Sequence, residues 1–234
     1  MILLAVDTCS EHGSLALARD DGWCEAVALP PEWKSTTLHH ELARLLERHG
    51  IKTRDLAAYA VTSGPGAFTG LRIGLTMVKA LAEVHGKPIY PVSTLEVVAA
   101  AAREQLPESY SGDLISLLDA RRGQIFGAIY HAEGNGLRRT SGETVCALKS
   151  FLAQVQSSTS GSVSFCATEI DRFAEEILRA GWKEAALLQV SRDLAATLAR
   201  MGLERGKAGP GVSAAAAEAN YVRPSDAELF WKGP

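Results

Sequence analysis

The sequence predicts an α/β protein of two lobes, each built from a mixed β-sheet flanked by helices. Short apolar segments rich in small and β-branched residues alternate with longer segments of helical periodicity. In addition, the strand that ends at Asp7 and the strand that ends at Asp119 begin the same series. A short polar turn follows each acid, then a returning strand, a glycine turn and a third strand. This repetition indicates an internal duplication, in layout rather than in residue identity.

The first lobe is expected to span residues 1–105. Its first helix is predicted to begin with Thr37 as the N-cap and to end at Gly50, because leucines recur at i, i+4, i+7 and i+8 between them. Thr69 is the expected N-cap of the second helix. The expected strands are 2–6, 14–19, 23–29, 56–63 and 88–92, and the expected helices are 37–49, 71–85 and 94–104.

The second lobe is expected to span residues 106–206, after a linker over 106–112. The segment 207–234 is expected to pack back on the first lobe. A glycine-rich linker over 206–211 leads into this segment, and its tail over 214–232 is expected to be helix or coil. The expected strands of the second lobe are 113–119, 124–131, 137–145 and 163–167, the expected helices are 172–180 and 191–204, and 157–161 is an expected loop.

Net charge, cysteine spacing and the N-terminal segment together limit the kinds of protein that this chain can be. The net charge is −3 and the isoelectric point is about 6.1, which argues against a protein that grips a nucleic-acid backbone by itself. The four cysteines have no Cys-x-x-Cys spacing, as expected for a reduced, cytosolic protein. The N-terminus starts directly in a strand, so we expect no signal peptide and no membrane span.

A glycine-rich stretch between a strand and a helix, Val61 to Gly74, is the main motif of the chain. It could hold a phosphate on the helix N-terminus, form a tight turn before a well-packed helix, or belong to a partner surface. Its spacing matches neither the P-loop nor the dinucleotide fingerprint. The residues expected to shape this loop are Gly64, Pro65, Gly66, Phe68, Gly70 and Gly74.

The helix after this loop has more apolar surface than one sheet can cover. Its polar residues form one narrow stripe, and apolar residues occupy the rest of its circumference. We therefore expect this helix and the helix before it to pack side by side and to bind a partner chain. The residues predicted to bind that partner are Leu38, Leu42, Leu71, Arg72, Leu75, Thr76, Val78, Lys79 and Ala82.

A duplicated meander with an acid at the end of each first strand is the plan of the actin, sugar kinase and Hsp70 architecture. In that plan the acid and a hydroxyl-rich turn face phosphate and Mg²⁺ between the lobes. Asp7, Thr8 and Ser10 would form such a phosphate loop here, with weak nucleotide binding. The alternative is an acid at a strand end that caps its own turn.

These residues also resemble the TsaB (YeaZ) family. The resemblance rests on Asp7-Thr8-Cys9-Ser10 and on the stretch from Ser63 to Gly74, with support from 91–95, 119–122 and 221–223. It implies a bacterial cytoplasmic role in making N6-threonylcarbamoyladenosine at position 37 of tRNAs that read ANN codons. It also implies a catalytic paralogue, TsaD, and an ATPase, TsaE, as partners, a homodimer when alone, and only indirect contact with tRNA. No cofactor is expected to bind tightly, although ATP and Mg²⁺ could act in the complex.

The sequence predicts no catalytic residue and no metal site. The resemblance places Thr94 and Val98 where the catalytic relative has two metal-binding histidines, and neither can replace imidazole. His39 and His40 are adjacent on a helix and point in different directions, so they make a poor metal pair. Three other functions stay open: an ATP-dependent phospho- or carbamoyl transferase acting through Asp7, Thr8 and Ser10, a metalloprotease, and a tRNA-binding module.

Overall fold

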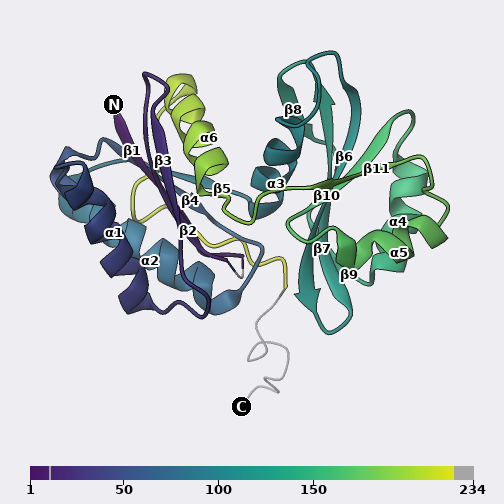
Figure 1. The fold of residues 1–234 in the computed structure, drawn as a ribbon, viewed down its shortest axis with the longest axis horizontal. Helices are drawn as coiled ribbons and strands as arrows, with labels where there is room; N and C mark the ends of the chain where they lie inside the picture. Colours follow the sequence, from purple (N-terminus) through teal and green to yellow (C-terminus); the bar gives the residue numbers. More distant parts are fainter. Residues whose placement is uncertain (11, 224–234) are drawn as a thin grey trace.

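The computed structural model describes residues 1–10 and 12–223, which form two lobes side by side (Figure 1). A five-stranded sheet forms the first lobe, in the order β3-β2-β1-β4-β5. Its strands are β1 (Ile2–Asp7), β2 (Ser14–Arg19), β3 (Cys24–Ala28), β4 (Ala58–Thr62) and β5 (Ile89–Val92).

A six-stranded sheet forms the second lobe, in the order β11-β10-β6-β7-β8, with β9 paired to β7 beside β8. Its strands are β6 (Ser111–Arg121), β7 (Gln124–Glu133), β8 (Gly136–Arg139), β9 (Thr144–Cys146), β10 (Val163–Ala167) and β11 (Ala186–Gln189).

The two sheets follow one plan, which confirms the predicted fold class and the duplication. In each, an antiparallel meander (β1-β2-β3 and β6-β7-β8) continues through its first strand into two parallel strands (β4-β5 and β10-β11). Asp7 and Asp119 take equivalent places near the ends of β1 and β6.

In the described residues, six α-helices form three layers around the two sheets (Figure 1). α1 and α2 cover the outer face of the first sheet, α4 and α5 cover the outer face of the second, and α3 and α6 lie between the sheets. The helices are α1 (Ser35–Arg48), α2 (Phe68–His85), α3 (Thr94–Arg103), α4 (Leu148–Ser158), α5 (Asp171–Arg179) and α6 (Ala195–Ala208), with a 3-10 turn at Thr53–Asp55.

The side chains of each strand point alternately to the two faces of its sheet, and this divides the apolar side chains among three cores. In β1, Leu3 and Ala5 face the central core, whereas Leu4 and Val6 face α1 and α2. Successive residues of a strand point to opposite faces, so a strand covered on both sides is apolar throughout. β1 therefore has five fully buried residues in a row from Leu3 to Asp7.

The helix that follows the last strand of each sheet packs against the other sheet. α3 follows β5 but lies against β6 and β7, and α6 follows β11 but lies against β1 and β2. Each sheet therefore needs a helix from the other half of the chain to complete its core, and the lobe boundaries expected at residues 105 and 206 stay predictions.

The segment after α6 spans both lobes. The Val212 N–H and C=O pair with Ile89 at the edge of the first sheet, and the Asn220 N–H donates to the Ser63 carbonyl (2.6 Å). Arg223 then donates to the Ala120 carbonyl (2.8 Å) in the second lobe. The described part of the tail thus packs on the first lobe and ends on the second. The expected tail also includes residues 224–232, which lie outside the described residues.

Several element boundaries differ from those expected. α1 begins after Lys34, and the Thr37 hydroxyl accepts the Lys34 N–H from inside the helix. α2 begins after Ala67 rather than at Thr69, because the Ala67 N–H is held by the Cys9 carbonyl (2.8 Å). The single strand expected over 137–145 is two short strands, and α4 and β11 were not expected. No helix among the described residues is long and apolar enough to cross a membrane.

Candidate functional site

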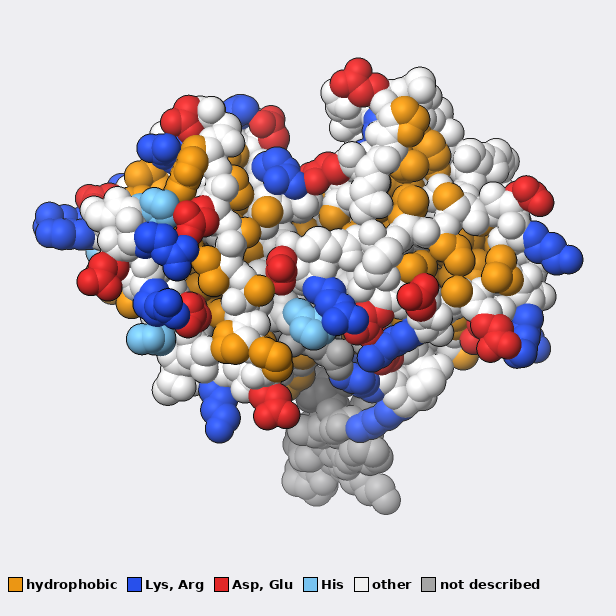
Figure 2. Space-filling model, viewed as in Figure 1, with side chains coloured by type: hydrophobic (Ala, Val, Ile, Leu, Met, Phe, Trp, Pro, Cys, Tyr) orange, Lys and Arg blue, Asp and Glu red, His pale blue; other side chains and the backbone are white. Residues whose placement is uncertain are grey.

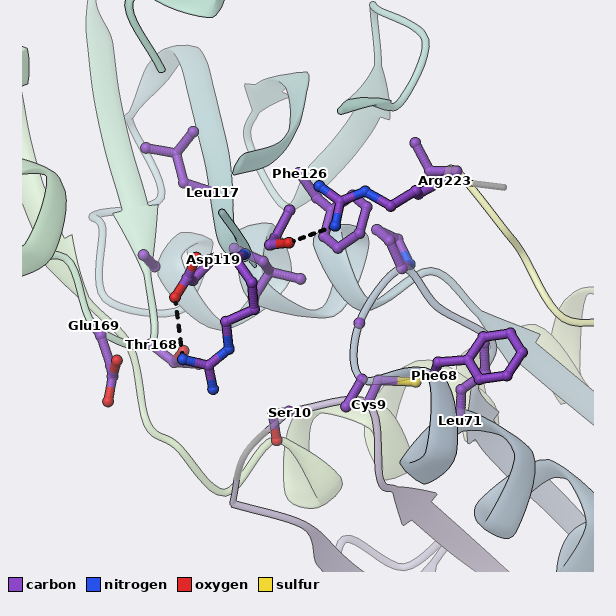
Figure 3. A pocket seen from close by; sticks show the side chains of 18 of the residues that line it. Cys9, Ser10, Phe68, Leu71, Leu117, Asp119, Phe126, Thr168, Glu169 and Arg223 are labelled. Carbon is purple, nitrogen blue, oxygen red and sulfur yellow. Dashed lines mark hydrogen bonds and ion pairs between the residues drawn. The ribbon is translucent and has the colours of Figure 1, made fainter. Parts of the chain in front are cut away.

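A cleft with a volume of about 690 Å³ lies between the lobes. The segments that follow β1, β4, β6 and β10 all line it. Ligands of open α/β sheets bind outside the carboxyl ends of strands, where such segments converge. Figure 3 shows Asp119, Thr168 and Glu169 of the second lobe opposite Cys9 and Ser10 of the first.

The predicted phosphate loop does not present its acid to this cleft. Asp7 is fully buried and accepts three hydrogen bonds from its own chain. Its Oδ1 accepts the Thr62 hydroxyl (2.8 Å) and the Cys9 N–H (3.1 Å), and its Oδ2 accepts the Ser10 hydroxyl (2.9 Å). Thr8 is also fully buried, and of the three residues only Ser10 lines the cleft. Asp7 and Thr8 therefore do not face the cleft in this structure, and their part in binding phosphate stays a prediction.

Burial shifts the pKa values of two groups in this turn, the Asp7 carboxyl and the Cys9 thiol. Desolvation raises the pKa of the Asp7 carboxyl above its usual value, although the hydrogen bonds from Thr62 and Ser10 oppose that shift. Desolvation, with the nearby Asp7 charge, also raises the pKa of the Cys9 thiol to about 12. Cys9 is thus a neutral thiol in the physiological range and a poor nucleophile.

The glycines of the main motif allow this turn to lie directly against α2. A Cβ at Gly66 would overlap the Cys9 carbonyl oxygen, and a Cβ at Gly70 or Gly74 would overlap Thr8. Gly64 has a left-handed φ of 103° and also lies close to the Asn220 backbone. Pro65 and Phe68 line the cleft. The motif therefore forms a tight turn before a closely packed helix, one of the three interpretations considered for it.

Arginines dominate the charge of the cleft. Among its described lining residues, six arginines face two carboxylates, in a chain whose net charge is −3. Asp119 Oδ2 accepts Arg172 (3.0 Å), and Glu169 pairs with both Arg172 (2.5 Å) and Arg192 (3.1 Å). In Figure 2, charged side chains gather where the two lobes meet. The six arginines are Arg72, Arg121, Arg122, Arg172, Arg192 and Arg223.

Two of these arginines occupy strained positions in the turn between β6 and β7. Arg121 and Arg122 have φ angles of 63° and 56°. Left-handed backbone costs a non-glycine residue about 1–2 kcal/mol, and such turns favour Asn and Gly. Asp119 Oδ1 accepts the Arg121 N–H (2.7 Å) and supports this conformation. The turn thus holds two arginine side chains at the cleft despite an unfavourable backbone.

An aromatic pair lies on the opposite side of the cleft, at the start of α2. The rings of Phe68 and Tyr221 are 5.5 Å apart and are 40% and 46% exposed. The Arg72 guanidinium lies 3.9 Å from the Phe68 ring centroid and donates to the Tyr221 hydroxyl (3.1 Å). The cleft therefore combines exposed rings with guanidinium groups.

The nine residues predicted to bind a partner do not form one surface. Six are buried within the single chain, so a partner contact through their side chains stays a prediction: Leu38, Leu42, Leu71, Leu75, Val78 and Ala82. Arg72 and Thr76 are exposed. Lys79 is half-buried and donates to the Ala217 carbonyl (3.0 Å).

Thr94 and Val98, where the resemblance would place metal-binding histidines of a catalytic relative, lie in the interior of the protein. Thr94 and Val98 are fully buried at the start of α3, and the Thr94 N–H donates to the Gly64 carbonyl (2.9 Å). No group of three His, Cys, Asp or Glu side chains with metal-binding geometry occurs among the described residues. His39 and His40 are both exposed on α1.

Sequence reasoning missed most of the cleft. Arg172, Arg192 and Phe126 have no role in any site hypothesis drawn from the sequence. One signal was available for Arg172, because it follows β10, the counterpart of β4 in the duplication. Nothing in the sequence pattern placed Arg192 or the tail residues Tyr221 and Arg223 at the cleft.

Comparison with known proteins identifies relatives of most of the chain. Residues 34–208 match the model of the family described as TsaD, tRNA N6-adenosine threonylcarbamoyltransferase. A Bacillus subtilis protein, tRNA threonylcarbamoyladenosine biosynthesis protein TsaB, is 35% identical over 138 residues. That match spans 58% of each chain, so the chain covers little more than half the length of this relative.

Solved structures extend the similarity to nearly the whole chain. YeaZ from Pseudomonas aeruginosa superposes with a TM-score of 0.72 and 26% identity, covering 94% of this chain and 99% of that one. A hexokinase of the ROK family from Thermus thermophilus is 12% identical and has a TM-score of 0.52, over 88% of this chain and 100% of its own. This second likeness concerns the fold alone, and it agrees with the predicted actin and sugar kinase architecture.

Proposed function

The chain belongs to the TsaB (YeaZ) family within the TsaD-related group, and from that membership we propose that it is a partner subunit without catalytic activity of its own. It binds and activates a TsaD-like enzyme that forms N6-threonylcarbamoyladenosine at position 37 of tRNAs reading ANN codons. The proposed setting is the cytoplasm, with a TsaE-like ATPase in the complex and a homodimer when TsaD is absent. ATP and Mg²⁺ act at the level of the complex, no cofactor binds this chain tightly, and tRNA contacts it only indirectly.

The observation that carries this proposal is the family match over residues 34–208, together with the YeaZ-like fold over almost the whole chain. The buried Thr94 and Val98 support a role without catalysis, because the resemblance places metal-binding histidines of the catalytic relative at these positions. The burial of Asp7 and Thr8 counts against the alternative transferase, which would need Asp7 to face its phosphate and metal.

The exposed side of α2 is the contact surface that we propose for the partner. Arg72, Thr76, Ala80 and Val84 are exposed at intervals of four and form one stripe along the helix. Val84 is 77% exposed, the highest value among the large apolar side chains of the described chain. Thr76 and Ala80 are small, so the backbone of a partner helix can approach α2 closely at the middle of this stripe.

Replacing Ala80 with Arg tests this surface. A long charged side chain at the centre of the stripe should weaken binding to the TsaD-like protein of the same genome by at least about tenfold, which corresponds to about 1.4 kcal/mol. Ala80 is exposed, so the variant should keep the wild-type melting temperature. Size-exclusion chromatography with light scattering and a binding titration give both quantities.

Ala153→Arg is the matched control, because Ala153 is an exposed helical alanine on α4 of the other lobe. This control should bind like the wild type. Equal affinity of the Ala80→Arg variant and the wild type would reject the proposed surface. A chain that forms no complex with the TsaD-like protein would reject the proposed function itself.

A further inference from the structure

We propose that the tail after α6 is a clasp that holds the two lobes together at the cleft and thereby sets the width of the cleft. The clasp is the segment 220–223, whose four residues all line the cleft. The tail before Asn220 is built into the first lobe, whereas the side chains of Asn220 and Arg223 bind the second lobe. The clasp does not depend on the function proposed above, because all of its contacts lie within this chain.

The tail is a fixed part of the first lobe as far as Asn220. The N–H and C=O of Val212 pair with the edge strand β5, each at 2.9 Å. Ala214 and Ala217 are buried in the core beneath α1 and α2. The Asn220 N–H then donates to the carbonyl of Ser63, directly after β4 (2.6 Å). This part of the tail cannot leave the first lobe without exposing apolar surface to water.

Glu143 joins the second lobe to the tail and to the first lobe. It lies between β8 and β9, and its side chain is 5% exposed. Its Oε1 accepts the Ser93 hydroxyl (2.5 Å) and the Arg139 guanidinium (3.0 Å), and its Oε2 accepts the Asn220 side-chain amide. Ser93 lies between β5 and α3. A carboxylate this well buried needs several donors, so Glu143 fixes the second lobe where Ser93 and Asn220 both reach it.

Arg223 makes the other contact between the clasp and the second lobe. Its two terminal nitrogens donate to separate acceptors, the Ala120 carbonyl (2.8 Å) and the Gln124 side-chain oxygen. Its guanidinium also lies 5.8 Å from the ring centroid of Phe126 (Figure 3). All three partners belong to β6 or β7. The segment 220–223 is therefore attached to the second lobe at both of its ends.

The two connections between the lobes differ in kind. α3 and α6 join the sheets through a continuous apolar core, whereas the clasp holds the second lobe mainly through side-chain hydrogen bonds at the wall of the cleft. Water can replace a partner in such a bond at little net cost, but it cannot replace apolar packing. In Figure 1 the last described part of the tail passes between the lobes below α3 and α6. Release of the clasp would therefore let the lobes rotate about the α3 and α6 layer and widen the cleft.

A distance measurement between the lobes tests the clasp. Spin labels are attached at Thr69→Cys on α2 and at Glu176→Cys on α5, two exposed positions on helices whose first turns line the cleft. Cys24→Ser and Cys146→Ser remove the native cysteines that are not buried. Double electron–electron resonance then gives the distance within one chain, because dilution with unlabelled protein removes distances between copies.

The clasp variant combines Asn220→Ala with Arg223→Ala in this labelled parent. We expect a longer mean distance and a broader distribution than in the parent, with an unchanged circular dichroism spectrum, because neither side chain belongs to an apolar core. Arg223→Ala alone should shift part of the population, since the bond between Asn220 and Glu143 remains. If the double variant does not fold, this single variant decides the test.

Lys79→Met is the matched control, because Lys79 donates to the tail at the Ala217 carbonyl (3.0 Å) entirely within the first lobe. This control should keep the distance distribution of the parent. An unchanged distribution in the folded clasp variant, or in Arg223→Ala where only that variant folds, would overturn the proposal. It would also be overturned if Lys79→Met lengthened the distance as much as the clasp variant does, because any loosening of the tail would then have the same effect.

Discussion

At the scale of single residues, Asp7 shows how a motif typical of a catalytic centre can have a structural role. The acid ends a buried strand and is followed by Thr8 and Ser10, the pattern expected of a phosphate loop. Its oxygens are instead satisfied by Thr62, Cys9 and Ser10, which fix the conformation of the turn. Gly70 and Gly74 then allow α2 to pack on that turn.

The raised pKa of Asp7 makes a specific prediction for stability against pH. Between its ordinary pKa of 3.8 and its higher value in the folded chain, the folded state holds a proton that the unfolded state has released. The free energy of unfolding of the wild type should therefore fall with rising pH across this interval, relative to Asp7→Asn. Urea denaturation of both proteins from acid to neutral pH measures the difference, and a constant difference would contradict the raised pKa.

At the scale of elements, α6 illustrates how closely a helix can approach a sheet of the other half of the chain. Gly202 lies against β1 and β4, and a Cβ there would come within 2.7 Å of the Ala60 Cβ. Gly206, one turn later, would place its Cβ no closer than 3.4 Å to Met1 and Tyr90. Two glycines on one helix thus have different roles, although their helical propensities are the same.

Alanine substitutions at these two glycines should therefore have opposite effects. Gly202→Ala overpacks the central core and should lower the free energy of unfolding by about 1–3 kcal/mol. Gly206→Ala meets no clash and should raise it by about 0.5–1 kcal/mol through helix propensity. Chemical denaturation of both variants measures this contrast. Equal destabilisation would mean that α6 approaches the sheet uniformly, contrary to the structure.

Sequence patterns predicted most elements because strands buried on both faces and amphipathic helices have clear signals. α4 was missed although Leu148, Phe151, Leu152 and Val155 have helical spacing, so the signal was present. β11 is a short strand at the sheet edge with little pattern. The start of α2 could not be predicted, since it depends on a contact between Ala67 and a distant turn.

At the scale of the whole molecule, the exchange of α3 and α6 was hidden from sequence reasoning. Both helices are apolar on the side that faces a sheet, and such a pattern does not specify which sheet. The cleft was hidden for a related reason, because its lining comes from six separate segments of both lobes. The duplicated layout predicted the two lobes, whereas the contacts between them depend on tertiary packing.

The exchanged helices predict that the two lobes unfold together. The central core joins both sheets through α3 and α6, so neither lobe can open without exposing apolar surface of the other. Tryptophans can report each lobe separately, since Trp23 and Trp33 pack on the first lobe and Trp182 packs on Phe165 in the second.

Two tryptophan variants test this cooperativity. One variant combines Trp182→Phe with Trp231→Phe, and its remaining tryptophans report the first lobe. The other variant combines Trp23→Phe, Trp33→Phe and Trp231→Phe, and its remaining tryptophan reports the second lobe. In each variant, the urea midpoint by fluorescence should equal the midpoint by circular dichroism of the same protein, because one transition unfolds both lobes. A fluorescence midpoint that departs from the circular dichroism midpoint would mean that the lobes fold as separate units. The central core around α3 and α6 would then contribute less to stability than its burial implies.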